Sequence, residues 1–146
     1  MTVDFHTHIF PPDVHENVDS YQKLDSGFDE IYSLSDARII GADDLIDALD
    51  RAEIKRAVIC GFGWSSNELC IKHNDTIIDA VQRYPERLIG FFTVLPSNDA
   101  ETINEMHRCI EAGLQGLGEM RPDNQEWNLR KPLEYSDLPE VIEPQN

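Results

Sequence analysis

Two almost uninterrupted apolar runs constrain the fold of this chain more than any other feature of its sequence. They are residues 57–61 and 88–95, and charged, glycine or proline residues bound each of them. Runs with so few polar residues indicate strands that are buried on both faces, as in a parallel sheet covered by helices. A further strand of this kind is expected at residues 114–118. The chain is therefore predicted to build a parallel sheet.

Segments with helical periodicity separate these strands. They are residues 43–52, 65–84 and 99–112. Ser65 and Glu68 have the spacing of a capping box at the start of the second segment, and Gly113 suits the position just after the third. With a short strand at residues 3–6, the order of strands and helices predicts an α/β fold with right-handed crossovers.

Two stretches lack this regularity. Residues 9–41, called the excursion here, are polar, carry Pro11-Pro12 and show no sustained period, so they are expected to form a long loop that covers a site. Residues 120–146 are expected to form an irregular polar tail. Residues 1–146 are then one partial domain, because the regular pattern stops without an ending.

Two architectures accommodate four strands with intervening helices. An open doubly wound sheet is complete at 146 residues, whereas a TIM barrel needs eight strands and about 250 residues. Open sheets usually bind a nucleotide, and residues 61–66 come close to the glycine fingerprint of such sites. The next strand ends in Leu95-Pro96, however, where a dinucleotide site requires an acidic residue. Length alone thus favours the open sheet, and the glycine pattern disfavours a nucleotide.

The charge of the chain excludes two classes of partner. Lys and Arg number 12 against 28 Asp and Glu, which gives a formal net charge of −16, and the pI is near 4.4. Such a surface repels nucleic acid and anionic membranes. The first residues lack the pattern of a secretory signal, and no apolar run approaches the roughly 18 residues of a membrane span. We therefore expect a cytoplasmic protein.

The segment Asp4-Phe5-His6-Thr7-His8 carries the clearest chemical signal. Side chains alternate along a strand, so His6 and His8 should project from the same face at the carboxyl end of the first strand. Two neutral imidazoles in this arrangement suit a divalent metal, Zn²⁺ above all. Asp4 is expected on the same face one step deeper, where it would support the ligands.

Glu119 is the second candidate for chemistry. It ends the strand at residues 114–118, so its carboxylate should stand on the same rim as the two histidines. There it would ligate the metal or move a proton as a catalytic residue. The alternative is a solvated acid paired with Arg121.

The remaining histidines, aromatic residues and cysteines are expected to have no chemical role. No role is given to His15, His73 and His107, which fall in the excursion or in helices. The side chains expected to pack are Phe10, Phe62 and Trp64 beneath the excursion and the reduced thiols Cys60, Cys70 and Cys109.

Residues 4–12, with the pattern DxHxH followed by proline, resemble the opening of the amidohydrolase superfamily. They are most similar to its amidohydrolase-related, aminocarboxymuconate-semialdehyde decarboxylase-like branch, and residues 116–123 look like the end of its fourth strand. The resemblance implies a distorted (β/α)8 barrel with one or two divalent metals and a small-molecule substrate. It also implies that His6 and His8 are the paired ligands of the first strand, and that Glu119 is an acid that some relatives use as a ligand.

The resemblance covers only about the first four β/α units, because the family also takes ligands from its fifth, sixth and eighth strands. The leading expectation is a metal-dependent hydrolase of C–N or C–O bonds that shows no appreciable turnover as this chain alone. Alternatives are a non-oxidative decarboxylase and a non-catalytic half-barrel interaction module. Free strand edges and the inward apolar side chains, taken to be Val3, Ile59, Phe91 and Leu117, predict a homo-oligomer or a second chain that completes the barrel.

Overall fold

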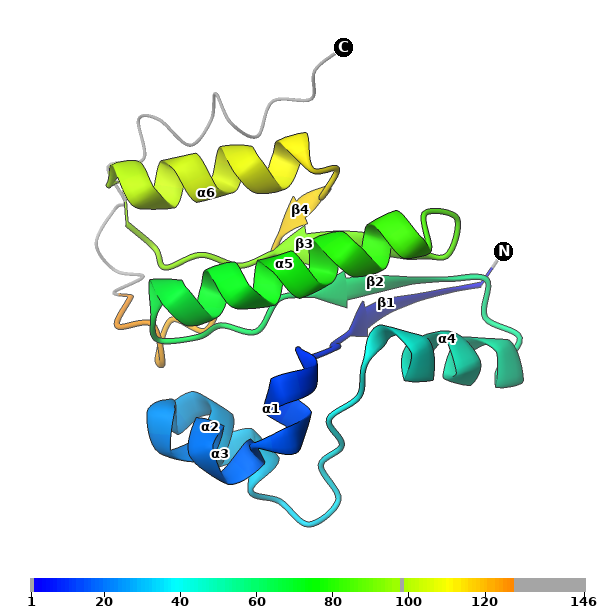
Figure 1. Ribbon diagram of the computed structural model, residues 1–146, viewed down its shortest axis with the longest axis horizontal. Helices are drawn as coiled ribbons and strands as arrows, with labels where there is room; N and C mark the ends of the chain where they lie inside the picture. Colours follow the sequence, from blue (N-terminus) through cyan, green and yellow to red (C-terminus); the bar gives the residue numbers. More distant parts are fainter. Residues whose placement is uncertain (1, 98, 128–146) are drawn as a thin grey trace.

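The computed structural model describes residues 2–97 and 99–127, which form a parallel sheet with helices packed on it (Figure 1). The sheet contains β1 (Val3–Thr7), β2 (Arg56–Cys60), β3 (Leu88–Phe92) and β4 (Gly116–Leu117), in that order. The predicted α/β fold is confirmed. A doubly wound sheet reverses its strand order at a switch point, whereas the sequential order seen here is that of a barrel. The open-sheet alternative is therefore disfavoured by topology.

Three helices connect the strands and cover one face of the sheet. They are α4 (Ala42–Arg51), α5 (Asn67–Arg83) and α6 (Ala100–Glu111). Each contributes to one apolar core, through Leu49, Ile77 and Met106 respectively, against strand residues such as Ile59. The apolar stripe that predicts each helix is thus the stripe that it buries, and burial of this kind stabilises the fold by roughly 25 cal/mol for each Å² removed from water.

The helix boundaries follow local capping chemistry. Ser66 caps α5, because its hydroxyl accepts a hydrogen bond from the backbone N–H of Leu69. The expectation that Ser65 is the cap is wrong by one residue. Asp99 caps α6 by accepting the backbone N–H of Thr102, and Gly113 follows its end, as predicted, with a φ of 96°, a conformation that favours glycine.

The excursion is not a long loop. It contains α1 (Pro12–Glu16), α2 (Val18–Leu24) and α3 (Ser26–Tyr32), so the prediction of an irregular cover is wrong. These helices share a second apolar core, separate from the first, with residues that follow β1 and β2. Its buried members are Phe10, Val14, Tyr21, Phe28, Phe62, Trp64 and Cys70. The prediction that Phe10, Phe62 and Trp64 pack beneath the excursion is confirmed, and all three cysteines are buried free thiols.

The two faces of the sheet differ from the sequence-based assignment. Ile59 and Leu117 pack in the core beneath the helices, so they do not face the inside of a barrel as expected. Alternation places Phe91 on the inward face, as expected, and puts Val58 there in place of Ile59. A side chain at Gly116 would come within 2.7 Å of the Phe91 ring, which explains why this strand carries glycine there.

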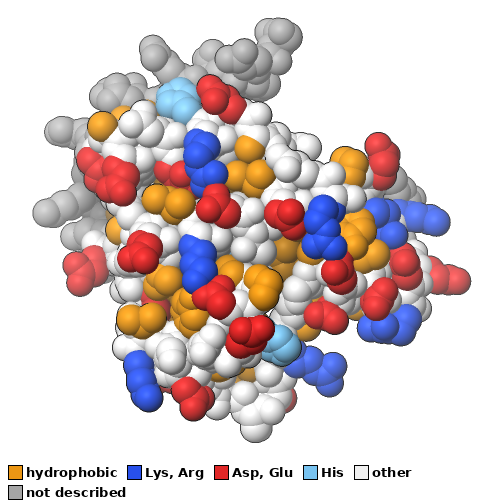
Figure 2. Space-filling model, in the orientation of Figure 1, with side chains coloured by type: hydrophobic (Ala, Val, Ile, Leu, Met, Phe, Trp, Pro, Cys, Tyr) orange, Lys and Arg blue, Asp and Glu red, His pale blue; other side chains and the backbone are white. Residues whose placement is uncertain are grey.

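The surface mixes both signs of charge. On the face in Figure 2, Lys and Arg side chains are interspersed with Asp and Glu. Within residues 2–97 and 99–127, no helix is both long and apolar enough to cross a membrane. Residues 120–127 contain turns without helix or strand, and the remaining residues 128–146 of the expected polar tail lie outside the described part of the chain.

Candidate metal centre

The end of β1 presents two histidines. His6 lies on the strand and His8 follows it directly. Thr7 fixes this end of the strand, because its hydroxyl donates a hydrogen bond of 2.8 Å to the carbonyl of Val58, and its backbone pairs with Ile59 on β2. The two imidazoles therefore stand at the carboxyl end of the sheet, where barrel enzymes place their chemistry.

Glu119 reaches the histidines although β4 is three positions from β1 in the sheet. After β4 the chain crosses the end of β3 and bonds to Gly61, the residue after β2. The backbone N–H of Glu119 donates to the Gly61 carbonyl at 2.7 Å, and the Gly61 N–H donates to the Gly118 carbonyl at 2.8 Å. Gly118 has a φ of 148°, which favours glycine at this bend. The crossing carries the Glu119 carboxylate toward β1.

Three potential ligand atoms converge at this point. His6 Nε2 lies 3.0 Å from His8 Nε2 and 2.8 Å from Glu119 Oε2, and the latter two atoms are 3.3 Å apart. Ligand atoms of a tetrahedral zinc ion with bonds near 2.0 Å are about 3.3 Å apart, so the triangle fits one face of a metal coordination sphere. Two imidazoles and a carboxylate also suit other divalent ions, including manganese. In the described residues, this group alone brings three such ligands together.

The tautomer of His8 suits a ligand. Its Nδ1 lies 3.1 Å from the carbonyl oxygen of Cys60, which can only accept a hydrogen bond, so Nδ1 carries the proton. In the neutral ring, Nε2 then offers its lone pair toward His6 and Glu119. Burial lowers the pKa of His8 below its ordinary value, against the opposing charge of Glu119. The ring is thus held in its metal-binding form.

Asp4 does not sit where strict alternation predicts. The pairing of β1 with β2 is irregular between Asp4 and Thr7, so alternation does not run unbroken from Asp4 to His6. The Asp4 carboxylate instead accepts a hydrogen bond of 3.3 Å from the backbone N–H of His6. It touches the main chain beside a candidate ligand, and a supporting role there remains a prediction.

His73 is a residue whose importance the sequence analysis missed. It is fully buried on α5, accepts a hydrogen bond from the Trp64 indole N–H at 2.9 Å, and lies 2.7 Å from the Ile9 carbonyl through Nε2. It thereby ties α5 to the segments that follow β1 and β2. Its spacing from Ile77 and Ala80 on the apolar face of the helix was the signal for burial. His15 is exposed, as expected, and His107 is exposed on α6.

Aromatic rings flank the three candidate ligands on the side of the excursion. Phe10 lies 6.5 Å from His8, centroid to centroid, with the planes only 28° apart, and Tyr32 meets Phe10 edge-on at 5.0 Å. Burial, assisted by the negative charge of Glu119, raises the pKa of Tyr32 to about 12. Tyr32 therefore keeps its phenolic proton at neutral pH.

A cavity of about 1050 Å³ lies at the other end of the sheet. Its lining includes Arg56 and Arg87 at the amino ends of β2 and β3, together with Pro85. Because the candidate ligands stand at the carboxyl ends, this cavity is separate from them.

Comparison with known proteins gives one family match. The family model Amidohydro_2, described as amidohydrolase, matches residues 3–141. A search of curated proteins finds no match.

Several solved structures share the fold. The chain is similar to 5-carboxyvanillate decarboxylase from Novosphingobium aromaticivorans, complexed with manganese and 4-hydroxy-3-methoxy-5-nitrobenzoic acid, with 21% identity and a TM-score of 0.68 over 97% of this chain and 46% of that chain. The decarboxylase LigW from Sphingomonas paucimobilis gives 13% identity and a TM-score of 0.71 over 97% and 48%. For 2,6-dihydroxybenzoate decarboxylase from Rhizobium the values are 15% and 0.54 over 80% and 37%.

At these identities the likeness establishes the fold and nothing finer. The chain spans about half the length of the first two structures. Its α/β fold is of the TIM-barrel type over roughly half of such a barrel, as the resemblance in its sequence implies.

Proposed function

The chain belongs to the amidohydrolase family, and from this premise we propose that it supplies the first half of the metal centre of a non-oxidative decarboxylase for an aromatic carboxylic acid. The observation that carries the proposal is the convergence of His6, His8 and Glu119 within hydrogen-bonding distance at the carboxyl ends of β1 and β4. This is where barrel enzymes bind substrate.

Each residue of the group would have its own role. His6 and His8 would hold a divalent ion through neutral imidazole nitrogens, and Glu119 would add a negatively charged ligand. The bound ion would supply a Lewis acid that binds and polarises an oxygen of the substrate. Asp4 steadies the main chain at His6 by accepting its N–H, which is a supporting role.

Tyr32 favours a planar aromatic substrate. Phe10 is buried against its neighbours, whereas Tyr32 is half-buried and meets Phe10 edge-on. The flat ring of Tyr32 would give a second flat ring stacking or edge contacts at low entropic cost. The protonated hydroxyl of Tyr32 would donate a hydrogen bond to a substrate oxygen, which an ionised phenol could not do.

Decarboxylation is preferred to hydrolysis for this site. The sequence alone favours hydrolysis first and decarboxylation second. The similar structures with TM-scores above 0.6 include two named as 5-carboxyvanillate decarboxylases, and their names support the reverse order. One of them was solved with manganese, so Mn²⁺ joins Zn²⁺ as a proposed ion for this chain.

Binding of a substrate analogue tests the proposal. The chain is loaded with Mn²⁺ or Zn²⁺ and titrated with 4-hydroxy-3-methoxy-5-nitrobenzoic acid, whose nitrophenol absorbance reports its surroundings. We expect binding that depends on the metal and that Glu119→Gln weakens. Glu111→Gln, at an exposed position at the end of α6, is the matched control and should leave binding unchanged. CO₂ release from 5-carboxyvanillate is measured with the same samples.

The outcomes separate the alternatives. Analogue binding without any metal dependence would overturn the proposal. Metal-dependent cleavage of esters or amides without CO₂ release would return the chain to hydrolysis. A chain that binds neither metal nor analogue but purifies with a protein partner would instead support the interaction module.

A further inference from the structure

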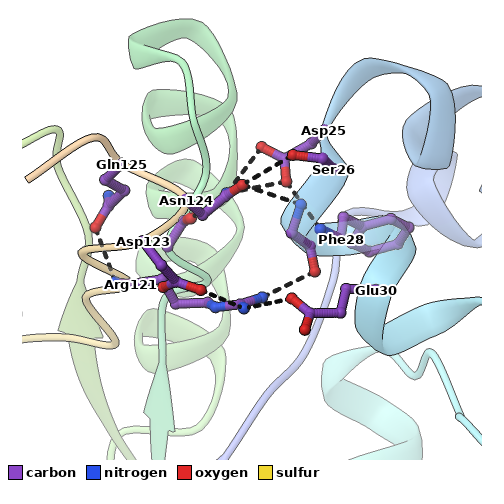
Figure 3. A network of polar contacts seen from close by, with 10 residues as sticks. Asp25, Ser26, Phe28, Glu30, Arg121, Asp123, Asn124 and Gln125 are labelled. Atoms are coloured by element: carbon purple, nitrogen blue, oxygen red, sulfur yellow. Dashed lines mark hydrogen bonds and ion pairs between the residues drawn. The ribbon is translucent and has the colours of Figure 1, made fainter.

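The turn at residues 121–125 is wedged between the excursion and the loop that follows β2, as Figure 3 shows. Its contacts come from three side chains. Arg121 donates to the Gly27 carbonyl at 2.8 Å and pairs with Glu30, and Gln125 donates to the Val94 carbonyl at 3.0 Å. Asn124, the third, lies at the centre of the network.

A buried carboxylate organises this network. Asp25 is only 1% exposed, at the start of α3. It accepts hydrogen bonds from the backbone N–H of Phe28 at 2.8 Å, and from the N–H and hydroxyl of Ser65 at 2.8 and 2.7 Å. A charge taken out of water in this way is costly unless donors surround it. The side-chain amide of Asn124 is the remaining donor, at 3.0 Å.

Asn124 uses both ends of its amide. Its Nδ2 donates to Asp25 and, at 2.9 Å, to the Gly63 carbonyl, while its Oδ1 accepts the backbone N–H of Gly27 at 3.0 Å. The packing is close, because a Cβ added at Gly27 would come within 2.5 Å of the Asn124 side chain. One amide thus joins α3, the loop after β2 and the turn at residues 121–125.

Asn124 connects the two chain segments that hold Glu119, which are the loop after β2 and the turn at residues 121–125. Gly61, two residues before Gly63, takes the backbone hydrogen bond from Glu119. Arg121, two residues after Glu119, packs against Gly63 so tightly that a Cβ there would come within 2.7 Å of the Arg121 nitrogen. The backbone of Glu119 is therefore fixed from two directions.

We propose that Asn124 is a positioning residue, which holds the Glu119 carboxylate at the metal by locking the turn at residues 121–125 to Asp25 and Gly63. The inference rests on the proposed function, since it concerns the same metal. Asparagine is required because the position needs a donor for Asp25 and an acceptor for Gly27. Leucine has the same number of side-chain heavy atoms, branched at the same position, and offers neither.

A double-mutant cycle with Mn²⁺ as the probe separates positioning from general stability. In the full chain, Asn124→Leu should weaken Mn²⁺ binding about tenfold or more, the range seen when support of a ligand is removed. In the Glu119→Gln background, Asn124→Leu should cause no further loss, because the ligand that it positions is gone. Electron paramagnetic resonance of free Mn²⁺ measures both affinities.

The matched control is Asn67→Leu. Asn67 lies on α5 and donates to Glu101, away from the turn, so its replacement should not change Mn²⁺ affinity. If Asn124→Leu does not fold, Arg121→Gln keeps the Asn124 contacts, removes those to Gly27 and Glu30, and should give a smaller loss, again only when Glu119 is present.

Equal losses in both backgrounds, or no loss in either, would overturn the inference and leave the metal centre standing. A wild-type chain that binds no Mn²⁺ would overturn the metal centre and the inference together. The two failures are therefore distinguishable.

Discussion

At the scale of single residues, His73 shows how a buried imidazole couples protonation to folding. Both of its ring nitrogens are engaged, one with the Trp64 indole and one with the Ile9 carbonyl, which fits only the neutral ring with the proton on Nε2. Burial lowers the pKa of His73 to about 3, although the bond to Ile9 acts in the opposite direction. Just below pH 6.5, His73 therefore stays neutral in the folded chain, whereas it binds a proton in the unfolded chain.

This linkage predicts that acid destabilises the fold well before carboxylates titrate. Below pH 6.5 the unfolded state binds the extra proton, so the free energy of unfolding should fall as pH falls, by about 2 kcal/mol from this group between pH 7 and 5. The measurement is urea unfolding at both pH values. For His73→Gln, which keeps a donor for Ile9, the loss of unfolding free energy between pH 7 and 5 should be smaller by about 2 kcal/mol. The same loss in the variant and the wild type would contradict this role of His73.

The candidate site was partly predictable at this scale. The spacing of His6 and His8 on one strand predicts that their side chains lie on the same face. The position of Glu119 at the end of a strand predicts that its carboxylate lies at the same end of the sheet as the histidines. Asn124 could not be found in this way, because its partners Asp25 and Gly63 are 99 and 61 residues away in sequence and carry no periodic signal. Such contacts exist only once the excursion has folded onto the sheet.

At the scale of elements, local sequence predicts the sheet and its covering helices but not the excursion. The strands and α4 to α6 each repeat an apolar pattern over enough residues to define a face. The helices α1 to α3 have 5, 7 and 7 residues, too few for a sustained period and too short to be stable alone. Their stability comes from Phe62 and Trp64, which lie after β2.

The second core therefore predicts a specific element-scale effect. Phe28 is fully buried and stacks on Trp64 at 5.1 Å and on Tyr32 at 4.7 Å. Phe28→Ala should lower the free energy of unfolding by about 3–5 kcal/mol, as large-to-small core changes do. Leu24→Ala, at a site that is 65% exposed in the same excursion, should cost under about 0.5 kcal/mol. Similar costs for both changes, measured by denaturant unfolding, would contradict this role of the second core.

At the scale of the whole molecule, the described sheet has two edges. Among residues 2–97 and 99–127, β1 and β4 each pair with one strand only. Phe5 on β1 is 71% exposed, which adds an apolar side chain to an open edge. We predict that the purified chain self-associates at micromolar concentration. Light scattering coupled to size exclusion measures this, and a compact monomer with a cooperative thermal transition would contradict it.

The proposed metal centre depends on ligands supplied by both edge strands of the described sheet, at their carboxyl ends. Isothermal titration with Zn²⁺ and with Mn²⁺ tests it most directly. The wild-type chain should bind one ion, His6→Ala combined with His8→Ala should abolish binding, and Glu119→Gln should weaken it. The exposed His15 and His107 provide matched controls, and their replacement by alanine should leave binding intact. Equal binding by the wild type and the His6→Ala, His8→Ala double variant would contradict the metal centre.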